Sequence, residues 1–158
     1  MNCLHYLYDK YKNAYLNKVE YGDTIPFIPP LDKCKVIKVY DGDTITVAQK
    51  LPYKKSPIYR FSVRLNGIDC PEIKGKNPDE KQCAQYAKKF VSKLIMNEIV
   101  ELRNISTEKY GRVLADVHYK NYNISELLIK EHLAVAYDGG TKKAPQSWIK
   151  YYDERDRV

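Results

Sequence analysis

The sequence contains no long hydrophobic run, so no segment of the chain is expected to cross a membrane. Residues 1–18 mix Tyr, Leu and Lys without a continuous apolar block, and no secretory signal peptide is predicted. None of the four cysteines forms a Cys-x-x-Cys pair, and the histidines lack zinc-finger spacing. These absences argue against membrane, secreted and zinc-binding classes and predict an intracellular protein, cytoplasmic or nuclear, with reduced thiols.

What the sequence does contain is an excess of positive charge. The 158 residues include 27 Lys and Arg against 20 Asp and Glu, a net charge of +7. Charges cancel over residues 1–33, so the whole excess lies in residues 34–158. With 44% hydrophobic residues, the chain is long enough to bury the core of one domain. A positive surface favours phosphate-bearing partners such as nucleic acids.

Residues 1–33 are predicted to form an N-terminal extension to a domain at 34–158. Residues 21–30 contain a glycine and three prolines, which predict a linker. The residues before it have apolar side chains at helical spacing, as expected for a Tyr-rich amphipathic helix, namely Leu4, Tyr8, Tyr11, Tyr15 and Val19. Two interpretations stay open: the helix packs on the domain, or the extension docks a protein partner or self-associates.

The domain itself has the pattern of a mainly β protein with helices. Short β-rich segments bounded by turn residues predict five strands, at 35–40, 44–47, 59–65, 98–102 and 112–119. In the third strand the apolar residues alternate with polar ones, so Arg64 is expected on the face opposite to the core. Five short strands with a helix between the third and fourth suggest a small closed barrel, whose open face often handles nucleic acid.

Three helices are predicted from their start signals. Asn77 can cap a helix that has Pro78 at its first position, and Glu80 can complete a capping box. Asn123 can cap a second helix, and Pro145 is expected to open a third.

Carboxylates are concentrated at two turns of the chain. Asp41 and Asp43 flank a glycine between the first two strands, and Asp69 and Glu72 follow the third strand. If these strands form a meander, both turns meet at one end of the barrel. Carboxylate oxygens there would suit a hard cation such as Ca²⁺ or Mg²⁺, although Asp-Gly-Asp is also an ordinary hairpin turn.

Two arginines lie close to these turns in the predicted barrel. Arg64 is near the end of the third strand and Arg112 opens the fifth. Guanidinium groups beside a carboxylate-bound cation suit a phosphodiester substrate, because they bind the phosphate oxygens in a planar, permanently charged arrangement. The alternative is that both arginines form ordinary surface ion pairs.

Three segments together resemble the signatures of the staphylococcal nuclease (thermonuclease) family. They are VYDGDT at 39–44, VRLNGIDCPE at 63–72 and KYGR at 109–112, in the family's order and approximate spacing. The resemblance covers about residues 34–152. It implies a five-stranded OB-fold barrel capped by about three helices. It also implies hydrolysis of DNA and RNA with Ca²⁺, or alternatively Mg²⁺ or Mn²⁺, and products that end in 5′-hydroxyl and 3′-phosphate.

The resemblance also implies which residues form the cation site. Asp43 and Asp69 correspond to the side-chain ligands, and Asp41 takes a supporting role. Cys70 corresponds to a position that binds the cation through its backbone carbonyl, so its thiol is not expected to be a ligand.

Further residues are assigned to catalysis by the same resemblance. Glu72 would orient or deprotonate the attacking water, while Arg64 and Arg112 would bind the scissile phosphate and stabilise its five-coordinate state.

Substrate-binding roles are likewise carried over from the family. Lys109 and Tyr110 match positions that contact a terminal phosphate, and Tyr137 matches an aromatic residue of the base site. Residues 138–141 lack the second nearby Tyr of the bacterial enzyme. His132 stands at a helix end where glycine would adopt the required backbone conformation without strain.

A second function is compatible with the same fold. A non-catalytic OB-fold module would bind nucleic acid or protein without cleavage, for example as a structural part of a larger assembly. The presence of Arg64, Glu72 and Arg112 together with Asp43 and Asp69 favours the enzyme. The DNA or RNA preference, the oligomeric state and an association with virions are left open.

Overall fold

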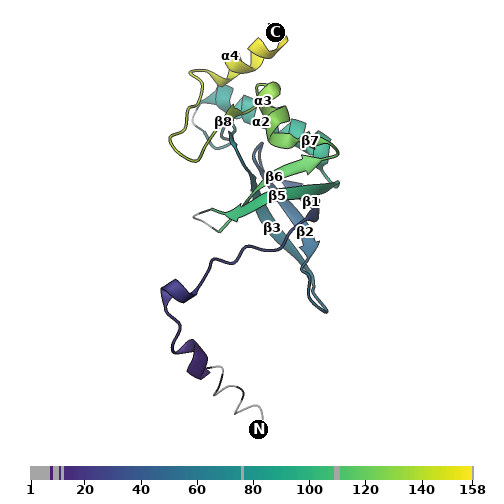
Figure 1. Ribbon diagram of the computed structural model, residues 1–158. Coiled ribbons are helices and arrows are strands. Elements are labelled where there is room, and N and C mark those ends of the chain that lie inside the picture. The colour runs from purple at the N-terminus through teal and green to yellow at the C-terminus, as the bar shows by residue number, and fades with distance from the viewer. Residues whose placement is uncertain (1–7, 9–10, 12, 76, 109–110, 158) are drawn as a thin grey trace.

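The computed structural model describes residues 8, 11, 13–75, 77–108 and 111–157. It has a β-barrel with helices gathered at one end, and an N-terminal extension that leaves at the other (Figure 1). Of the described helices, none combines the length and the apolar character that a bilayer crossing requires.

Five strands of the described chain close the barrel and confirm the predicted architecture. They are β1 (Lys33–Val39), β2 (Thr44–Lys50), β3 (Ile58–Leu65), β5 (Ile99–Thr107) and β6 (Val113–Tyr119). Antiparallel pairing joins them in the order β3-β2-β1-β5-β6, and a parallel pairing of β3 with β6 completes the circle. The parallel contact aligns Arg64 with Leu114, so the start of β6 lies beside the end of β3.

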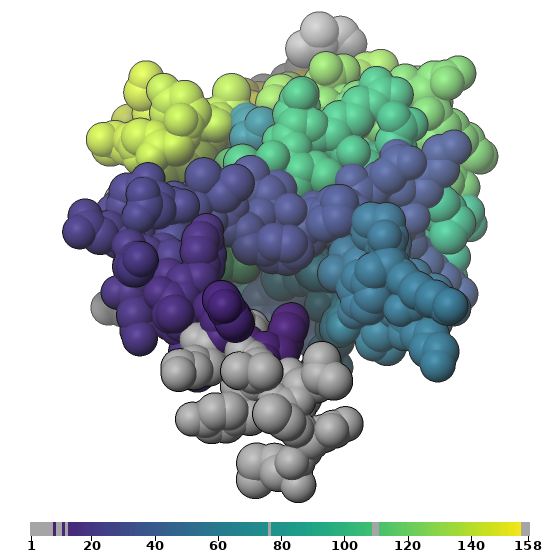
Figure 2. Space-filling model, turned by 60° about the horizontal axis from the view of Figure 1, so that its bottom comes forward, coloured from purple at the N-terminus to yellow at the C-terminus, as the bar shows by residue number. Residues whose placement is uncertain are grey.

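The alternation expected in β3 holds only over its second half. Val63 and Leu65 are fully buried, whereas Tyr59 is exposed and Phe61 is half-buried. Tyr59 instead contacts Phe61 and Tyr53 through their rings, because this half of β3 belongs to a hairpin that extends beyond the barrel. Figures 1 and 2 both show the tip of the β2–β3 hairpin (blue) standing out from the surface.

The helix α2 (Pro78–Ile95) starts as predicted, with Asn77 accepting a hydrogen bond from the Asp79 N–H at 2.9 Å. The predicted capping box is wrong: the Glu80 carboxylate accepts instead from the backbone N–H of Glu72, at 3.1 Å. The helix therefore stabilises its own N-terminus with Asn77 alone and uses Glu80 to hold the preceding loop.

The other two helices differ in how well their starts could be predicted. Asn123 caps α3 (Ile124–Lys130) by accepting from the Ser125 N–H at 2.8 Å, as expected. Pro145 does not open the last helix: α4 (Trp148–Asp153) begins three residues later, because Ser147 provides the side-chain cap. Single turns of 3₁₀-helix lie at η1 (Tyr21–Asp23) and η2 (Glu154–Arg157).

The second residue after α3 has the backbone conformation that the sequence suggested. His132 has φ of 54°, in the left-handed region that favours glycine. Its ring stacks on Tyr151 at 4.4 Å, and its Nδ1 lies 2.7 Å from the Tyr151 carbonyl oxygen. These contacts offset the cost of the unfavourable φ.

Very short strands bring the C-terminal loop to the end of the barrel. The strand β4 (Ile68–Asp69) pairs with β8 (Val135–Ala136), so that Asp69 lies opposite Val135. Tyr137 then donates its N–H to the Gly67 carbonyl at 2.9 Å. The remaining strand, β7 (Tyr122–Asn123), extends β6 by a tight turn.

The described part of the N-terminal extension has no buried side chain before Pro29. Tyr8, Tyr11 and Tyr15 are exposed, and residues 13–16 are helical. Figure 2 shows this segment (purple) at the lower edge of the molecule. Leu4 lies outside the described residues, and the division of the chain between residues 33 and 34 stays a prediction.

Candidate active site

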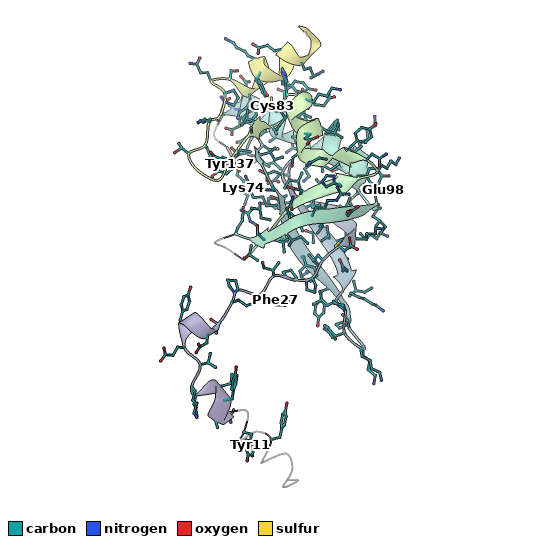
Figure 3. All side chains as sticks on the ribbon, in the orientation of Figure 1. Tyr11, Phe27, Lys74, Cys83, Glu98 and Tyr137 are labelled. Carbon is teal, nitrogen blue, oxygen red and sulfur yellow. The ribbon has the colours of Figure 1, made fainter. Side chains whose placement is uncertain are left out.

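A cleft of about 730 Å³ lies at the end of the barrel where the two acidic turns meet. Its lining includes seven of the residues predicted from the sequence: Asp41, Asp43, Arg64, Cys70, Glu72, Arg112 and Tyr137. Asp69 joins them through its ion pair with Arg64, whereas Lys109 and Tyr110 lie outside the described residues. In Figure 3, Tyr137 and Lys74 lie at one edge of the barrel, across from Glu98.

Arg64 is the centre of the charged network. Its Nη1 contacts Asp43 Oδ2 at 2.6 Å, and its Nη2 contacts Asp69 Oδ1 at 3.3 Å. Strand register explains the first contact, because Arg64 pairs with Thr44, the residue that follows Asp43. Burial lowers the pKa of the Arg64 guanidinium, but neighbouring carboxylates outweigh this and raise it overall. The side chain is 12% exposed and stays charged.

Glu108 joins the two arginines, and the sequence analysis did not identify it. Its Oε1 contacts Arg64 Nε at 3.3 Å, while its Oε2 contacts Arg112 Nη2 at 2.7 Å and accepts from Arg112 Nε at 2.8 Å. A tight turn supports this arrangement, since the Glu108 N–H donates to the Arg112 carbonyl and the Gly111 N–H donates to the Glu108 carbonyl. One carboxylate thus fixes the separation of both guanidinium groups.

Lys142 is a second residue that the sequence analysis missed. Its Nζ lies 2.9 Å from Asp69 Oδ1 and 3.0 Å from Glu72 Oε1. Partial burial lowers the pKa of this ammonium, but the hydrogen bonds to the two carboxylates raise it overall. The β4–β8 pairing accounts for its position, because the loop that carries Lys142 leaves β8 beside Asp69.

Glu72 occupies the outer part of the cleft. Its side chain is 59% exposed, and Lys142 is its contact partner among the described side chains. The Glu72 backbone is fixed by the hydrogen bond from its N–H to the Glu80 carboxylate of α2. An exposed carboxylate whose backbone is fixed can reach a water molecule at the mouth of the cleft.

The turn before β2 concentrates negative charge. The Asp43 N–H donates to Asp41 Oδ1 at 3.2 Å, and Asp43 Oδ1 accepts from the Thr44 hydroxyl at 2.8 Å. Burial and the charge of Asp43 raise the pKa of Asp41 to about 6. Burial, followed by the charges of Asp43 and Asp41, raises the pKa of the Cys70 thiol well above its ordinary value. Cys70 is therefore a neutral thiol in this structure.

A cation in this cleft would have few protein ligands and would keep most of its water. Within the described residues, no group of three or more His, Cys, Asp or Glu side chains could hold a metal ion. Asp43 and Asp69 nevertheless converge on the single guanidinium of Arg64, and both are almost completely buried. One or two carboxylates with water and substrate phosphate is a common ligand set for Mg²⁺, and Ca²⁺ accepts a similar mixture of oxygens.

Comparisons with known proteins find a matching family model and several similar proteins. Residues 62–155, more than half of the chain, match the family model described as staphylococcal nuclease homologue. The chain is 36% identical over 104 residues to an uncharacterized endonuclease of Haemophilus influenzae. This match covers 66% of this chain and 52% of that protein. It is 35% identical over 104 residues to the thermonuclease of Staphylococcus hyicus, covering 65% of this chain and 57% of that protein.

A fungal relative gives a shorter match. A probable endonuclease of Eremothecium gossypii is 32% identical over 82 residues, which cover 49% of this chain and 30% of that protein. The chain thus spans about half, or less, of the length of the relatives that it matches.

Proposed function

Because the chain belongs to the staphylococcal nuclease family, we propose that it hydrolyses phosphodiester bonds of DNA and RNA by in-line attack of water. The observation that carries this proposal is the pairing of Arg64 and Arg112 through Glu108. Two guanidinium groups at fixed separation, beside buried carboxylates, match the charge and shape of a phosphodiester in a five-coordinate state.

The arginines take complementary roles in this proposal. Arg112 is 36% exposed and uses Nε and Nη2 on Glu108, so its outer edge is directed to incoming phosphate. Arg64 is more deeply buried and holds the inner acidic residues in place. As negative charge grows on the phosphate oxygens, the positive charges of both groups stabilise it.

Glu72 is proposed to orient or deprotonate the attacking water. Its side chain is 59% exposed, in contrast to the almost completely buried Asp43 and Asp69. A carboxylate at the mouth of the cleft can accept a proton from water and release it to solvent afterwards.

A divalent cation is proposed to bind to Asp43, Asp69 and the Cys70 carbonyl, with Asp41 in a supporting role. The family resemblance favours Ca²⁺ over Mg²⁺ or Mn²⁺ as this cation. When bound, such a cation would supply positive charge next to a phosphoryl oxygen and lower the pKa of nearby water.

The proposal is tested by digestion of plasmid DNA and of RNA, first with Ca²⁺ and then with chelator. We expect degradation only with the cation, and about a thousandfold lower kcat/KM in Arg112→Ala and Glu72→Gln. Arg103→Ala and Glu101→Gln are matched controls, because these residues form an exposed ion pair at 2.7 Å on β5 outside the cleft.

Equal activity of the cleft variants and their controls would contradict the assigned roles. Salt-sensitive binding of nucleic acid without cleavage under any cation would instead identify a non-catalytic binding module.

A further inference from the structure

The Lys142 ammonium contacts two carboxylates of the cleft, yet Lys142 has no role in the proposed hydrolysis. Its Nζ bridges Asp69 and Glu72, at 2.9 Å and 3.0 Å. These are the residues to which cation binding and water activation have been assigned. The side chain is 49% exposed, so it is free to change partners.

We propose that Lys142 is a phosphate-binding residue that exchanges partners, leaving Asp69 when a divalent cation binds there and moving to the substrate phosphate. This inference rests on the proposed function and names one more residue that recognises the substrate.

Coulomb repulsion makes the first half of the exchange necessary. A Ca²⁺ bound to Asp69 would lie roughly 2.4 Å from the carboxylate oxygen. The Lys142 ammonium at its present position is 2.9 Å from the same carboxylate. A divalent cation and an ammonium that share one carboxylate repel each other strongly, whereas a half-exposed ion pair of this kind is weak. Arg64 Nη2 also contacts this Asp69 oxygen, at 3.3 Å, but Arg64 is only 12% exposed and is held by Asp43 and Glu108 as well. Lys142 is 49% exposed, so its ammonium is the group that gives way to the cation.

The surroundings of the cleft determine where the ammonium goes. Lys142 lines the same cleft as Arg64 and Arg112. Its loop is attached beside Asp69 through the β4–β8 pairing, and Tyr137 holds the start of the loop by donating its hydroxyl to the Gly140 carbonyl at 3.0 Å. The four-carbon side chain can move by a few ångströms while its backbone stays at the cleft. A phosphodiester between the two arginines then offers the nearest new anionic oxygens.

The adjacent residue provides a matched control. Lys143 lies on the same loop, is exposed and is not part of the lining of the cleft. Lys142→Gln and Lys143→Gln therefore remove the same charge from neighbouring positions, and only the first removes contacts to Asp69 and Glu72. Lys142→Arg keeps the charge.

The first measurement is a calorimetric titration of the full chain with Ca²⁺ in the absence of nucleic acid. Lys142→Gln is expected to bind Ca²⁺ about threefold to tenfold more tightly, because the competing ammonium is gone. Lys143→Gln should stay within about twofold of the parent chain. Unchanged or weaker Ca²⁺ binding in Lys142→Gln would overturn the exchange.

The second measurement uses a 3′-phosphorylated mononucleotide, which has no scissile bond, at saturating Ca²⁺. Lys142→Gln should bind it about fivefold more weakly, Lys142→Arg should restore binding, and Lys143→Gln should have little effect. Opposite effects on cation and phosphate affinity are not expected of a residue that merely supports the fold. Tighter Ca²⁺ binding with unchanged nucleotide binding would overturn the phosphate-binding role.

The outcomes separate this inference from the proposed function. A chain that binds Ca²⁺ and mononucleotide as described but cleaves no nucleic acid would refute the nuclease and leave the exchange intact. A chain that cleaves, but whose Lys142→Gln variant matches Lys143→Gln in both titrations, would refute the exchange alone. Absence of binding of Ca²⁺, Mg²⁺ and Mn²⁺ alike would overturn both.

Discussion

Glu108 shows how one side chain can determine the geometry of two others. It contacts Arg64 through one carboxylate oxygen and Arg112 through the other. Arg64 lies on β3 and Arg112 directly before β6, so neither could set the separation by itself. Exposed ion pairs contribute little to stability, but a carboxylate that orients two substrate-binding groups affects catalysis through their position.

Substitution Glu108→Gln tests this positioning role. The amide keeps the size of the side chain but loses the charge that attracts both guanidinium groups, and we expect kcat/KM to fall about 10- to 100-fold. Glu101→Gln is the control, because Glu101 contacts Arg103 at 2.7 Å on an exposed part of β5. A steady-state assay with both variants decides the matter; equal rates would mean that Glu108 has no influence on the arginines.

Buried cysteines yield a prediction about reactivity. Cys34 donates its thiol to Gln49 Oε1 at 2.7 Å, and burial raises its pKa from 9.0 to about 11; burial also raises the pKa of Cys83 to about 11. At pH 8 both thiols are therefore neutral and should resist alkylation in the folded chain. Since unfolded thiols ionise at lower pH, their contribution to stability is lost as the pH rises from about 9 to 11.

The alkylation is measured by peptide mapping after iodoacetamide treatment, with and without denaturant. Modification of Cys34 or Cys83 is expected only in denaturant. Equally fast modification of the native chain would show that these sites open without global unfolding.

The sequence predicted the main charged residues of the cleft but missed two of the groups that connect them. Asp43, Arg64 and Arg112 belong to recognisable signatures. Glu108 precedes one signature, and its partners become adjacent only when the barrel closes. Lys142 stands next to Lys143, and nothing local distinguishes them. Only the pairing of two very short strands brings the first into the cleft.

At the scale of elements, the turn at 41–43 packs directly against α2. A Cβ added to Gly42 would lie 2.7 Å from the Ala87 Cβ and 2.8 Å from the Cys70 Sγ. Both neighbours are buried, so there is little room for either to move. The absence of a side chain at Gly42 allows the acidic turn and the helix to approach this closely.

Gly42→Ala should therefore destabilise the fold by about 1–3 kcal/mol, through overpacking. For a chain of this size the melting temperature should fall by roughly 2–4 °C for each kcal/mol. Gly22→Ala is the control, because a Cβ there would have no neighbour within 4 Å. Thermal unfolding of both variants is the measurement, and an unchanged melting temperature of Gly42→Ala would mean that the turn can shift away from α2.

Element prediction succeeded where a strong local signal exists. Short β-rich segments bounded by turn residues identified the barrel strands, and Asn77 and Asn123 identified two helix starts. It failed at Glu80, which contacts Glu72 instead of its own helix end. It also failed where two start signals stand close together, since α4 starts from Ser147 instead of Pro145. Strands of two residues, such as β4 and β8, are too short to have a periodicity.

At the scale of the whole molecule, the N-terminal extension adds no buried described side chain before Pro29. Deletion of residues 1–27 should therefore leave the melting temperature of the barrel within about 2 °C, because surface changes rarely affect stability by more than a fraction of a kcal/mol. Thermal unfolding of the full and shortened chains measures this.

The same pair of proteins addresses the two interpretations of the extension. A fall of many degrees would contradict the prediction and favour a helix that packs on the domain. A change of apparent mass in solution, with an unchanged melting temperature, would favour self-association.

The parallel contact between β3 and β6 has a consequence for folding kinetics. It joins Val63 to Val113 and Arg64 to Leu114, residues about fifty positions apart along the chain. Contacts of such long range are costly in loop entropy and tend to form late. Arg64 and Arg112 are carried by the two segments that this contact unites, so a nascent or partly opened chain would hold them apart. Activity would then return, during refolding, in step with the slowest structural phase.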